Sequence, residues 1–397
     1  MGESGVKIEV HLIQNFVPSS LNRDDTNQPK SAYFGGFRRA RISSQCIKRA
    51  VREWWRDNNS VSLGMRTKKL QQLIKDELAK DASFMEKVKS GEDLSERVRN
   101  FTDLFYAKAD KKNSEKTSVL VFISHEEVEV CAKLVKEQWD NLKGKEKEGE
   151  EKSKWNKKDL DSVTAKLRSL AIGSDIALFG RMLAEHADLN TDGACQVAHA
   201  ISTHRVDMEM DFYTAVDDLN PEEETGAGMM GIIGYNSACY YRYAVVDRDQ
   251  LARNLARKTE RNNGKWSQEL DDEDYREADA IIKAFLEAMV FATPSGRQNS
   301  FAARNLPSFG LFIKRQGGVP VSLANAFVKP VWPRREGDDL VHMSVDAMIK
   351  HWNDIRSTYE DKGIDAVSCF KVGLDEVPDS VREYTKGSLR EAIDAVL

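Results

Sequence analysis

The sequence predicts an α+β protein whose elements run in the order strand, helix, strands, helix, strand. Alternating residues typical of strands occur at Val6–Ile13 and Cys239–Val246, and a further strand is predicted at Phe309–Lys314. Apolar residues at helical spacing follow Ser43 and recur through Asp274–Phe291. This is the β-α-β-β-α-β arrangement of ferredoxin-like and RNA-recognition folds, here with large insertions.

Length and composition set limits on this fold. The chain has 397 residues, of which 31% are charged and 41% hydrophobic, so we expect a globular protein of two or three compact units. No apolar run is long enough to span a membrane, and Met1–Lys7 lacks the features of a signal peptide. We therefore expect a cytoplasmic protein without membrane contacts. Its five cysteines form no Cys-x-x-Cys pair, which favours reduced, mostly buried thiols over disulfides or a zinc site.

The first strand is predicted at Val6–Ile13, where apolar residues alternate with Lys7, Glu9 and His11. This period of two indicates a strand with one buried face. The following segment, Pro18–Lys30, is rich in Pro, Ser, Asn and Asp and predicts a loop.

A helix is predicted after Gly35–Gly36. Ser43 and Ser44 offer N-cap hydroxyls, and apolar residues then follow at helical spacing, at Ile47, Val51 and Trp54. The polar residues beside this apolar stripe should share one broad basic face, made of Gln45, Lys48, Arg49, Arg52 and Arg56.

The region around this helix is basic although the net charge of the chain is −5. Between its first and last basic residue there is no acid, and it contains Lys30, Arg38, Arg39, Arg41, Lys48, Arg49 and Arg52. A solvated helix face usually carries Glu among its Lys residues, whereas guanidinium groups suit phosphate oxygens. Because salt confines the field of a charge to about 10 Å, a local basic patch can hold a polyanion on an acidic body. The block predicts phosphate binding.

A helical insertion is predicted between Gly64 and Ser169, where the sequence is highly charged and only Ser118–Ile123 is strand-like. Its helices are expected at Met65–Leu78, Ser95–Phe105 and His125–Leu142. After it, further strands are predicted at Asp175–Phe179, Gln196–Val206, Cys239–Val246 and Phe309–Lys314, with helices at Asp274–Phe291 and Val345–Tyr359. The sheet is therefore assembled from distant parts of the chain.

A protruding hairpin is predicted at Asp211–Gly231, where acids and glycines flank Phe212 and Tyr213. Aromatic residues exposed on such a hairpin would need a partner, and they are able to stack on bases. A half-buried strand is the alternative, because aromatic residues next to Thr214 are also typical of strands.

Signals for catalysis or metal binding are weak. The chain has no P-loop, G-x-S-x-G or H-E-x-x-H motif. His199 and His204 are five apart on a predicted strand, so they should point to opposite faces, which disfavours joint metal ligation. The pairs Asp24–Asp25 and Asp217–Asp218 have the chemistry to hold Mg²⁺ beside RNA phosphates, but adjacent aspartates are more typical of turns and caps. We expect no catalytic residue, metal or cofactor.

Several motifs, in order along the chain, resemble the CasC family. They are Leu21–Asp25, Gly35–Gly36, Arg38–Gln45 with Lys48–Ala50, Asp175–Leu178, Gly180–Met182, Ala198–Ile201 and Phe212–Leu219. The resemblance runs from the first strand to about Lys329. CasC is the repeated backbone subunit of the type I-E CRISPR surveillance complex, Cascade.

The resemblance implies a modified RNA-recognition (ferredoxin-like) palm, an inserted helical fingers domain and a protruding thumb hairpin. The palm would comprise residues 1–60, 171–210 and 232–397, the last with C-terminal helices. The fingers would comprise residues 61–170 and the thumb residues 211–231. Copies would stack head to tail along a CRISPR RNA, and each thumb would turn one nucleotide out while the others stay free to pair with target DNA.

The resemblance also implies roles for individual residues. Contacts to the guide backbone would fall to Arg23, Lys30, Ser43, Gln45, Lys48, Arg49 and Arg52. The thumb and its base wedge would involve Met182, Phe212, Tyr213, Thr214, Val216 and Met230. Target DNA would be held by Lys154, Lys157 and Lys158, for which a plain solvated charge run is an equal alternative. The chain departs from the family pattern at Glu222–Glu224, at Arg257–Asp274 and after Lys329.

The leading hypothesis is a non-catalytic RNA-binding scaffold, with CRISPR RNA, target DNA, other copies of itself and other Cascade subunits as partners. A guide-bound ribonuclease of a related CRISPR effector is the alternative, and it would use Asp24, Asp25, Asp217 or Asp218. A general single-strand RNA chaperone is a third reading, and it would bind RNA without assembling on a guide.

Overall fold

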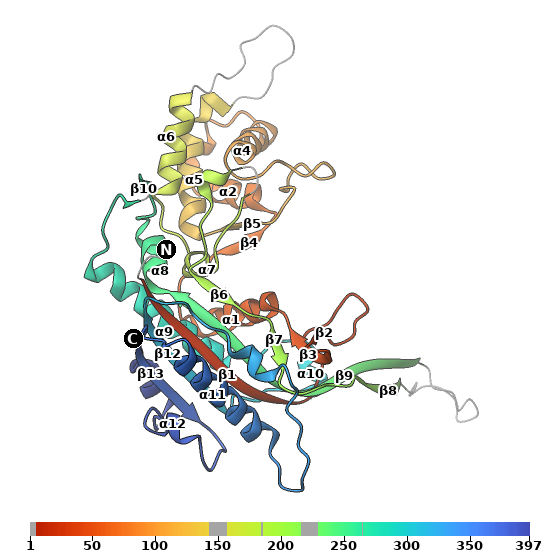
Figure 1. The fold of residues 1–397 in the computed structure, drawn as a ribbon. Helices are drawn as coiled ribbons and strands as arrows, with labels where there is room; N and C mark the ends of the chain where they lie inside the picture. Colours follow the sequence, from red (N-terminus) through yellow and green to blue (C-terminus); the bar gives the residue numbers. More distant parts are fainter. Residues whose placement is uncertain (1–4, 143–156, 184–185, 216–228, 264) are drawn as a thin grey trace, which may run out of the picture. The chain divides into compact units, whose positions relative to one another are not determined.

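The computed structural model describes residues 5–142, 157–183, 186–215, 229–263 and 265–397 (Figure 1). Within these ranges no helix is long and apolar enough to cross a bilayer. The chain divides into two compact units. The first comprises Met1–Asn58, Cys195–Asp247 and Ile282–Leu397, and the second comprises Asn59–Ala194 and Arg248–Ile281.

The first unit is built on an antiparallel sheet with the strand order β13-β12-β1-β9-β7-β3-β2. Its strands are β1 (Val6–Ser19), β2 (Ser31–Phe34), β3 (Phe37–Ile42), β6 (Cys195–Val197), β7 (Ala200–Ser202), β8 (Glu209–Ala215), β9 (Met229–Asp247), β12 (Phe309–Gln316) and β13 (Ile364–Lys371). The long strand β9 also pairs with β6 and with β8.

The central strands confirm the predicted α+β class. Along the chain, β1, helix α1 (Ser44–Asn58), β7, β9, helix α9 (Asp272–Phe291) and β12 follow one another in the order β-α-β-β-α-β. In the sheet, β1 and β9 lie in the middle, with β12 beside β1 and β7 beside β9. The strands β13, β3 and β2 then widen the sheet on both sides.

Helices cover both faces of this sheet. On one side α1 and α9 are joined by Trp55, whose Nε1 donates to the carbonyl oxygen of Ala284 at 3.0 Å. On the other side Ile13, Tyr241 and Leu311 form a core with α11. The helix α9 belongs to this unit from Ile282 onward, and its earlier part belongs to the second unit. The helices of this unit beyond α1 and α9 are α10 (Gln298–Phe301), η3 (Leu323–Phe327), α11 (Leu340–Thr358), α12 (Asp379–Arg382) and α13 (Leu389–Asp394).

Strand β1 is longer than predicted, and the expectation of one buried face is wrong. Glu9 and His11 are both 0% exposed. The Arg315 Nε donates to Glu9 Oε1 at 2.9 Å, and His11 Nδ1 lies 2.9 Å from Tyr241 Oη. Polar partners therefore replace water on the face that η3 and α11 cover. An alternating sequence does not distinguish a face exposed to solvent from a face buried against polar groups.

The segment Asp175–Phe179 is helical, not a strand as predicted. It forms α7 (Ser174–Phe179), all of which except its last residue is buried. A short apolar run that is buried all round has no periodicity to separate strand from helix. The Asp175 Oδ1 accepts the Gly64 N–H at 2.8 Å, which fixes this turn in place. The predicted strand Gln196–Val206 is likewise divided into β6 and β7.

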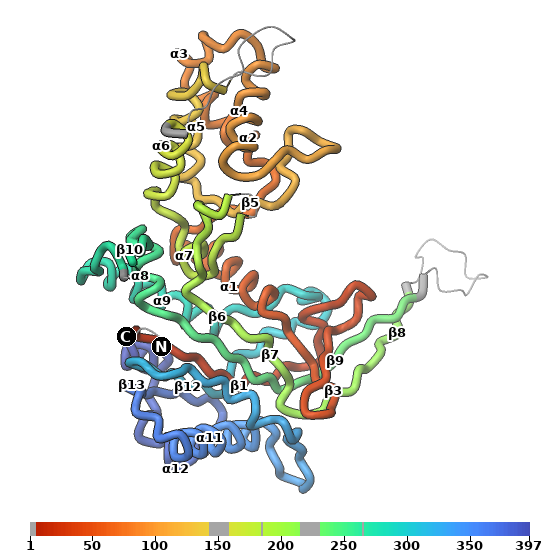
Figure 2. Tube along the Cα trace, turned by 45° about the horizontal axis from the view of Figure 1, so that its top comes forward, coloured from red at the N-terminus to blue at the C-terminus, as the bar shows by residue number. Residues whose placement is uncertain are grey.

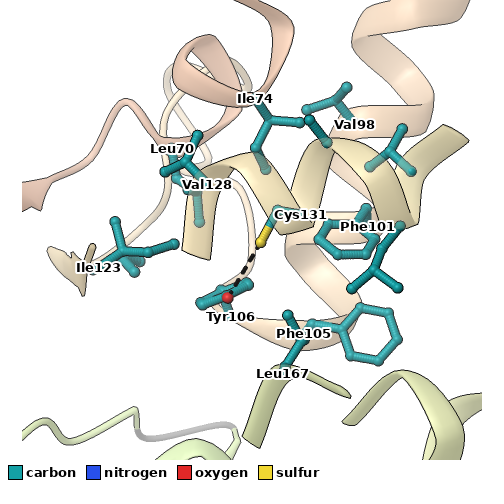
Figure 3. Packing of buried hydrophobic residues seen from close by; sticks show 14 of the residues in the cluster. Leu70, Ile74, Val98, Phe101, Phe105, Tyr106, Ile123, Val128, Cys131 and Leu167 are labelled. Atoms are coloured by element: carbon teal, nitrogen blue, oxygen red, sulfur yellow. Dashed lines mark hydrogen bonds between the residues drawn. The ribbon is translucent and has the colours of Figure 1, made fainter. Parts of the chain in front are cut away.

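Helices dominate the second unit between Gly64 and Ser169, as predicted, although Met65 begins a strand and not a helix. Its elements besides α7 are β4 (Met65–Thr67), α2 (Leu70–Ala79), α3 (Ala82–Met85), α4 (Gly91–Phe105), β5 (Val121–Ile123), α5 (His125–Glu137), η1 (Trp139–Leu142), α6 (Lys157–Arg168), η2 (Ala187–Leu189), α8 (Arg248–Ala256), β10 (Arg261–Asn262) and β11 (Lys265–Trp266). Figure 3 shows its core, in which Leu70, Phe101 and Val128 pack around Cys131.

The cysteines are free thiols, and all except Cys46 are buried, as predicted. The Tyr106 Oη lies 3.3 Å from the Cys131 Sγ (Figure 3). Burial raises the pKa of both Cys131 and Cys195 to about 12. These two thiols therefore stay protonated near neutral pH and act as small apolar core residues.

We expect acid to destabilise the first unit through His11. Burial, with a contribution from Arg315, lowers the pKa of His11 from 6.5 to about 3. Between these values the unfolded chain binds a proton that the folded chain does not. The stability is therefore full above pH 6.5 and is lost as the pH falls, by at most about 1.4 kcal/mol per pH unit. Urea unfolding at pH 7 and pH 5 should show a smaller loss for His11→Gln than for the wild type, and equal losses would contradict this account.

Candidate nucleic-acid interface

The loop between β1 and β2 is shaped by Asp24. Its Oδ1 accepts hydrogen bonds from the Thr26 hydroxyl (2.7 Å), the Thr26 N–H (2.9 Å) and the Gln28 N–H (3.0 Å). These bonds, the Thr26 hydroxyl foremost, lower the pKa of Asp24. The neighbouring Arg23 is exposed and donates to Asn27 Oδ1. Asp24 thus folds the loop, while the Arg23 guanidinium lies at the surface.

The start of α1 is tied to this loop through Ser43. The Ser43 Oγ accepts the Cys46 N–H at 3.3 Å, as predicted for an N-cap, and the Ser43 N–H donates to Asn22 Oδ1 at 2.8 Å. Ser43 is buried, so its hydroxyl caps the first turn of the helix and is not exposed at the surface. On the following turn Gln45 and Arg49 are exposed.

Two arginines of the basic block lie in the interior. Arg39 is fully buried and donates to the carbonyl oxygens of Ser202 (3.1 Å) and Phe327 (2.6 Å). Arg52 is only 9% exposed, so the basic face of α1 is narrower than predicted. The block therefore has a structural part and a surface part. Its basic residues that stay exposed or half-buried are Lys30, Arg38, Arg41, Lys48 and Arg49, and the neighbouring Arg23 and Arg56 are exposed.

A cleft of about 540 Å³ opens between the loop and α1. Arg23 lines it from the loop and Arg49 from α1, and a third wall is formed by the segment Pro294–Arg297, which precedes α10. Nothing in the sequence marks this segment as part of the site, because it has no periodicity and lies far along the chain. A tight tertiary contact brings it here: a Cβ on Gly296 would lie 2.3 Å from the Leu21 carbonyl oxygen.

Strands β8 and β9 form the predicted hairpin, which leaves the sheet next to β3 in Figure 2. Its described part carries an apolar face made of Met210, Phe212 and Ile232, which are 58%, 61% and 64% exposed. Phe212 and Ile232 are direct cross-strand partners, so their side chains lie on the same face. On the opposite face Tyr213 lies over Gly231, where a Cβ would be 2.4 Å from its ring.

The base of the hairpin is fixed against the same loop. A Cβ on Gly234 would lie 1.8 Å from Gln28 Oε1, so β9 and the loop are in close contact. The ring of Tyr235 packs against that of Phe301 in α10 at 5.9 Å between centroids. The loop, the cleft and the hairpin therefore form one continuous surface of the first unit.

The other predicted site residues are distributed over both units. Thr214 is exposed and pairs with Met230, while Val216 lies outside the described residues, as do Asp217, Asp218 and Glu222–Glu224. In the second unit Met182 is 82% exposed, next to Arg181, whose guanidinium is buried against Glu127 at 2.6 Å. Of the three lysines, Lys157 and Lys158 begin α6, and Lys154 lies outside the described residues.

Among the described residues, the central strands of the sheet offer no aromatic platform for bases. RNA-recognition domains stack bases on exposed aromatic residues of their central strands. Here aromatic rings on β9 and β12, such as Tyr241 and Phe309, are buried under η3 and α11. In the described part of the first unit, exposed groups with the chemistry to contact phosphates or bases lie at the β2–β3 edge, in the cleft and on the hairpin.

No metal centre is found in the described ranges, where no three or more His, Cys, Asp or Glu side chains gather to hold an ion. His199 and His204 have separate partners. His199 Nδ1 lies 3.0 Å from an Arg41 guanidinium nitrogen, and His204 Nε2 accepts the Cys239 N–H at 3.2 Å.

The fold and its surface define a ferredoxin-like α+β protein with a basic edge and an exposed apolar hairpin. The chain belongs to the CT1975-like protein family, whose model matches residues 8–395. This membership confirms the resemblance to the backbone proteins of Cascade.

Solved structures agree with this assignment. A chain of a "CRISPR RNA-guided surveillance complex, pre-nicking" is 26% identical, with a TM-score of 0.76 over 98% of both chains. A chain of a "CRISPR RNA-guided surveillance complex" is 22% identical, with a TM-score of 0.69 over 98% of both chains, and has the same fold. Among curated proteins none matches this sequence.

We expect the apolar face of the hairpin to contribute little to folding. Phe212 and Ile232 are mostly exposed, so the double change Phe212→Ser, Ile232→Ser should alter the free energy of unfolding by no more than about 1 kcal/mol, about 0.5 kcal/mol for each substitution. The buried Phe309 serves as a comparison, because Phe309→Ala should cost about 3–5 kcal/mol. Urea unfolding followed by circular dichroism measures both, and a similar loss in the two variants would make the hairpin part of the core.

Proposed function

We propose that this chain is the repeated, guide-binding backbone subunit of a type I-E Cascade complex, without catalytic activity. The observation that carries the proposal is the hairpin, whose apolar face is exposed beside a basic loop and helix. Isolated proteins seldom expose such faces without a partner. The full-length likeness to chains of CRISPR RNA-guided surveillance complexes supports CRISPR RNA and other subunits of that complex as the partners.

The basic edge provides donors for an RNA backbone. Arg23 on the loop and Gln45, Lys48 and Arg49 on α1 are exposed or half-buried, and Lys30 joins the loop to β2. We assign guide-phosphate contacts to these five. Ser43 and Arg52 are buried and support the same surface from beneath. Such contacts are electrostatic and tolerate any sequence, which suits a subunit that must bind guides of varied sequence.

The hairpin provides the base wedge and the contact with the next copy. Phe212, Tyr213 and Thr214 belong to this wedge, together with Val216, Met230 and Met182. An aromatic face that stacks on a displaced base leaves the neighbouring bases free to pair with target DNA. A head-to-tail interface that does not close into a ring propagates as a helix, so the length of the RNA would limit the number of copies. Lys154, Lys157 and Lys158 are assigned to target DNA.

The assembly test uses the hairpin variant Phe212→Ser, Ile232→Ser together with guide RNA. A stacked aromatic contributes about 1–3 kcal/mol, so the affinity of each repeat should fall roughly five- to hundredfold. Size measurements with and without guide RNA should show ordered oligomers for the wild type and mostly free, folded monomer for the variant.

The control for this test removes exposed apolar area elsewhere in the first unit. Val319 and Val372 are 76% and 62% exposed, and Val319→Ser, Val372→Ser should assemble like the wild type. If the hairpin variant assembled normally too, the hairpin would have no part in the mechanism.

The ribonuclease alternative is tested at Asp24. The Asp24 carboxylate folds the loop through three hydrogen bonds. The variant Asp24→Asn should therefore either weaken assembly or behave like the wild type, and RNA cleavage should not differ between the two. The assembled complex is incubated with complementary RNA and Mg²⁺, and the products are separated by size. Regularly spaced products that disappear in the variant would establish a ribonuclease and overturn the scaffold.

A further inference from the structure

We propose that Arg297 completes a three-arginine phosphate site in the cleft, together with Arg23 and Arg49. The ligand is a phosphate of single-stranded RNA with its attached sugars. This inference rests on the proposed function, because it deepens the path of the guide. It assigns a role to a residue that lies about 250 positions after α1 and outside every motif noted in the sequence.

The side chain of Arg297 lacks an acceptor. Its Nε is buried without a hydrogen-bond partner. Among the described residues no carboxylate forms an ion pair with it. The residue nevertheless lines the cleft, so its positive charge, which no carboxylate of the described ranges neutralises in an ion pair, is available to an anion that enters there. This uncompensated charge is the observation from which the site follows.

The backbone of Arg297 is strained in a way that fits a site. Its φ is 48°, a left-handed conformation that residues other than glycine rarely adopt. Such strain persists only where the surroundings impose it, and it concentrates at binding sites. Here the surroundings are rigid: Gln298 Nε2 donates to the carbonyl oxygens of Pro294 (2.9 Å) and Ala303 (3.0 Å). Together with the contact of Gly296 on Leu21, these bonds keep the wall in place before any ligand arrives.

The charges of the cleft leave room for an anion. Its two acids are already engaged, since Asp24 accepts the N–H groups of its own loop and Glu53 Oε1 accepts Arg49 Nε at 2.7 Å. The Arg49 side chain is 75% exposed, and an exposed pair of this kind contributes little. A phosphate can therefore replace Glu53 as the partner of Arg49 and bind Arg23 and Arg297 at the same time. The volume of about 540 Å³ lies within the range of small-ligand sites, so a sugar and its phosphate fit.

The test measures binding of single-stranded RNA by the full chain at several salt concentrations. Arg297→Gln should weaken binding roughly tenfold, because a charge-assisted hydrogen bond is lost. It should also reduce the slope of log K against log salt by about 0.7, the value for one phosphate. The matched control is Arg304→Gln, which removes the same charge from an exposed side chain just after α10 that does not line the cleft. The control should bind like the wild type.

Two further variants keep the inference falsifiable. Arg297→Lys retains the charge without the guanidinium fork, so it should melt like the wild type and bind RNA with intermediate affinity. The double change Arg23→Gln, Arg49→Gln tests the wider basic edge. If the wild type itself retained no RNA, the proposed function would fail. If the double variant weakened binding while Arg297→Gln and Arg297→Lys matched Arg304→Gln, only the present inference would fail.

Parallel measurements with DNA of the same sequence separate a plain phosphate contact, which affects both ligands equally, from one that also involves the ribose.

Discussion

The burial of β1 and β9 on both faces is the constraint on which the rest of the first unit depends. With α1 and α9 on one side and η3 and α11 on the other, a polar group inside the sheet has no water and must have a protein partner. Glu9 is therefore paired with Arg315, and Arg39 is bound to backbone carbonyl oxygens. The same burial removes from the central strands the platform that RNA-recognition domains use, so the proposed binding groups are those on the edge and the hairpin.

The candidate surface includes close contacts between distant segments. Gly296 lies against the Leu21 carbonyl and Gly35 against the Val328 carbonyl, and a Cβ at either glycine would collide with backbone. Glycine is needed at these two positions because only hydrogen fits, whereas Gly234 lies against the side chain of Gln28, which is able to move. These contacts connect the β1–β2 loop with β9 and the segment before α10, so a surface made of loops has the rigidity of the sheet beneath it.

The basic block illustrates how one stretch of sequence can carry two functions. Arg39 is buried against backbone carbonyl oxygens and Arg52 is largely buried, whereas Arg23 and Arg49 are exposed and Lys48 is half-buried. On a strand, neighbouring residues alternate between faces, and on a helix they rotate by about 100°. A run of arginines therefore divides necessarily between interior and surface, and a count of charges overstates the basic patch.

The sequence by itself determined the α+β class, the long helices α9 and α11, the start of α1 at Ser43, the hairpin and the family. These follow from local periodicity, capping and ordered motifs, which are written in neighbouring residues. Only the tertiary structure decided that Glu9 and His11 are buried, that Asp175–Phe179 is helical, and that Arg52 lies largely inside. It also brought Arg297 to the cleft. Each of these depends on what packs against a segment, and burial by distant parts of the chain leaves no periodic trace in the segment itself.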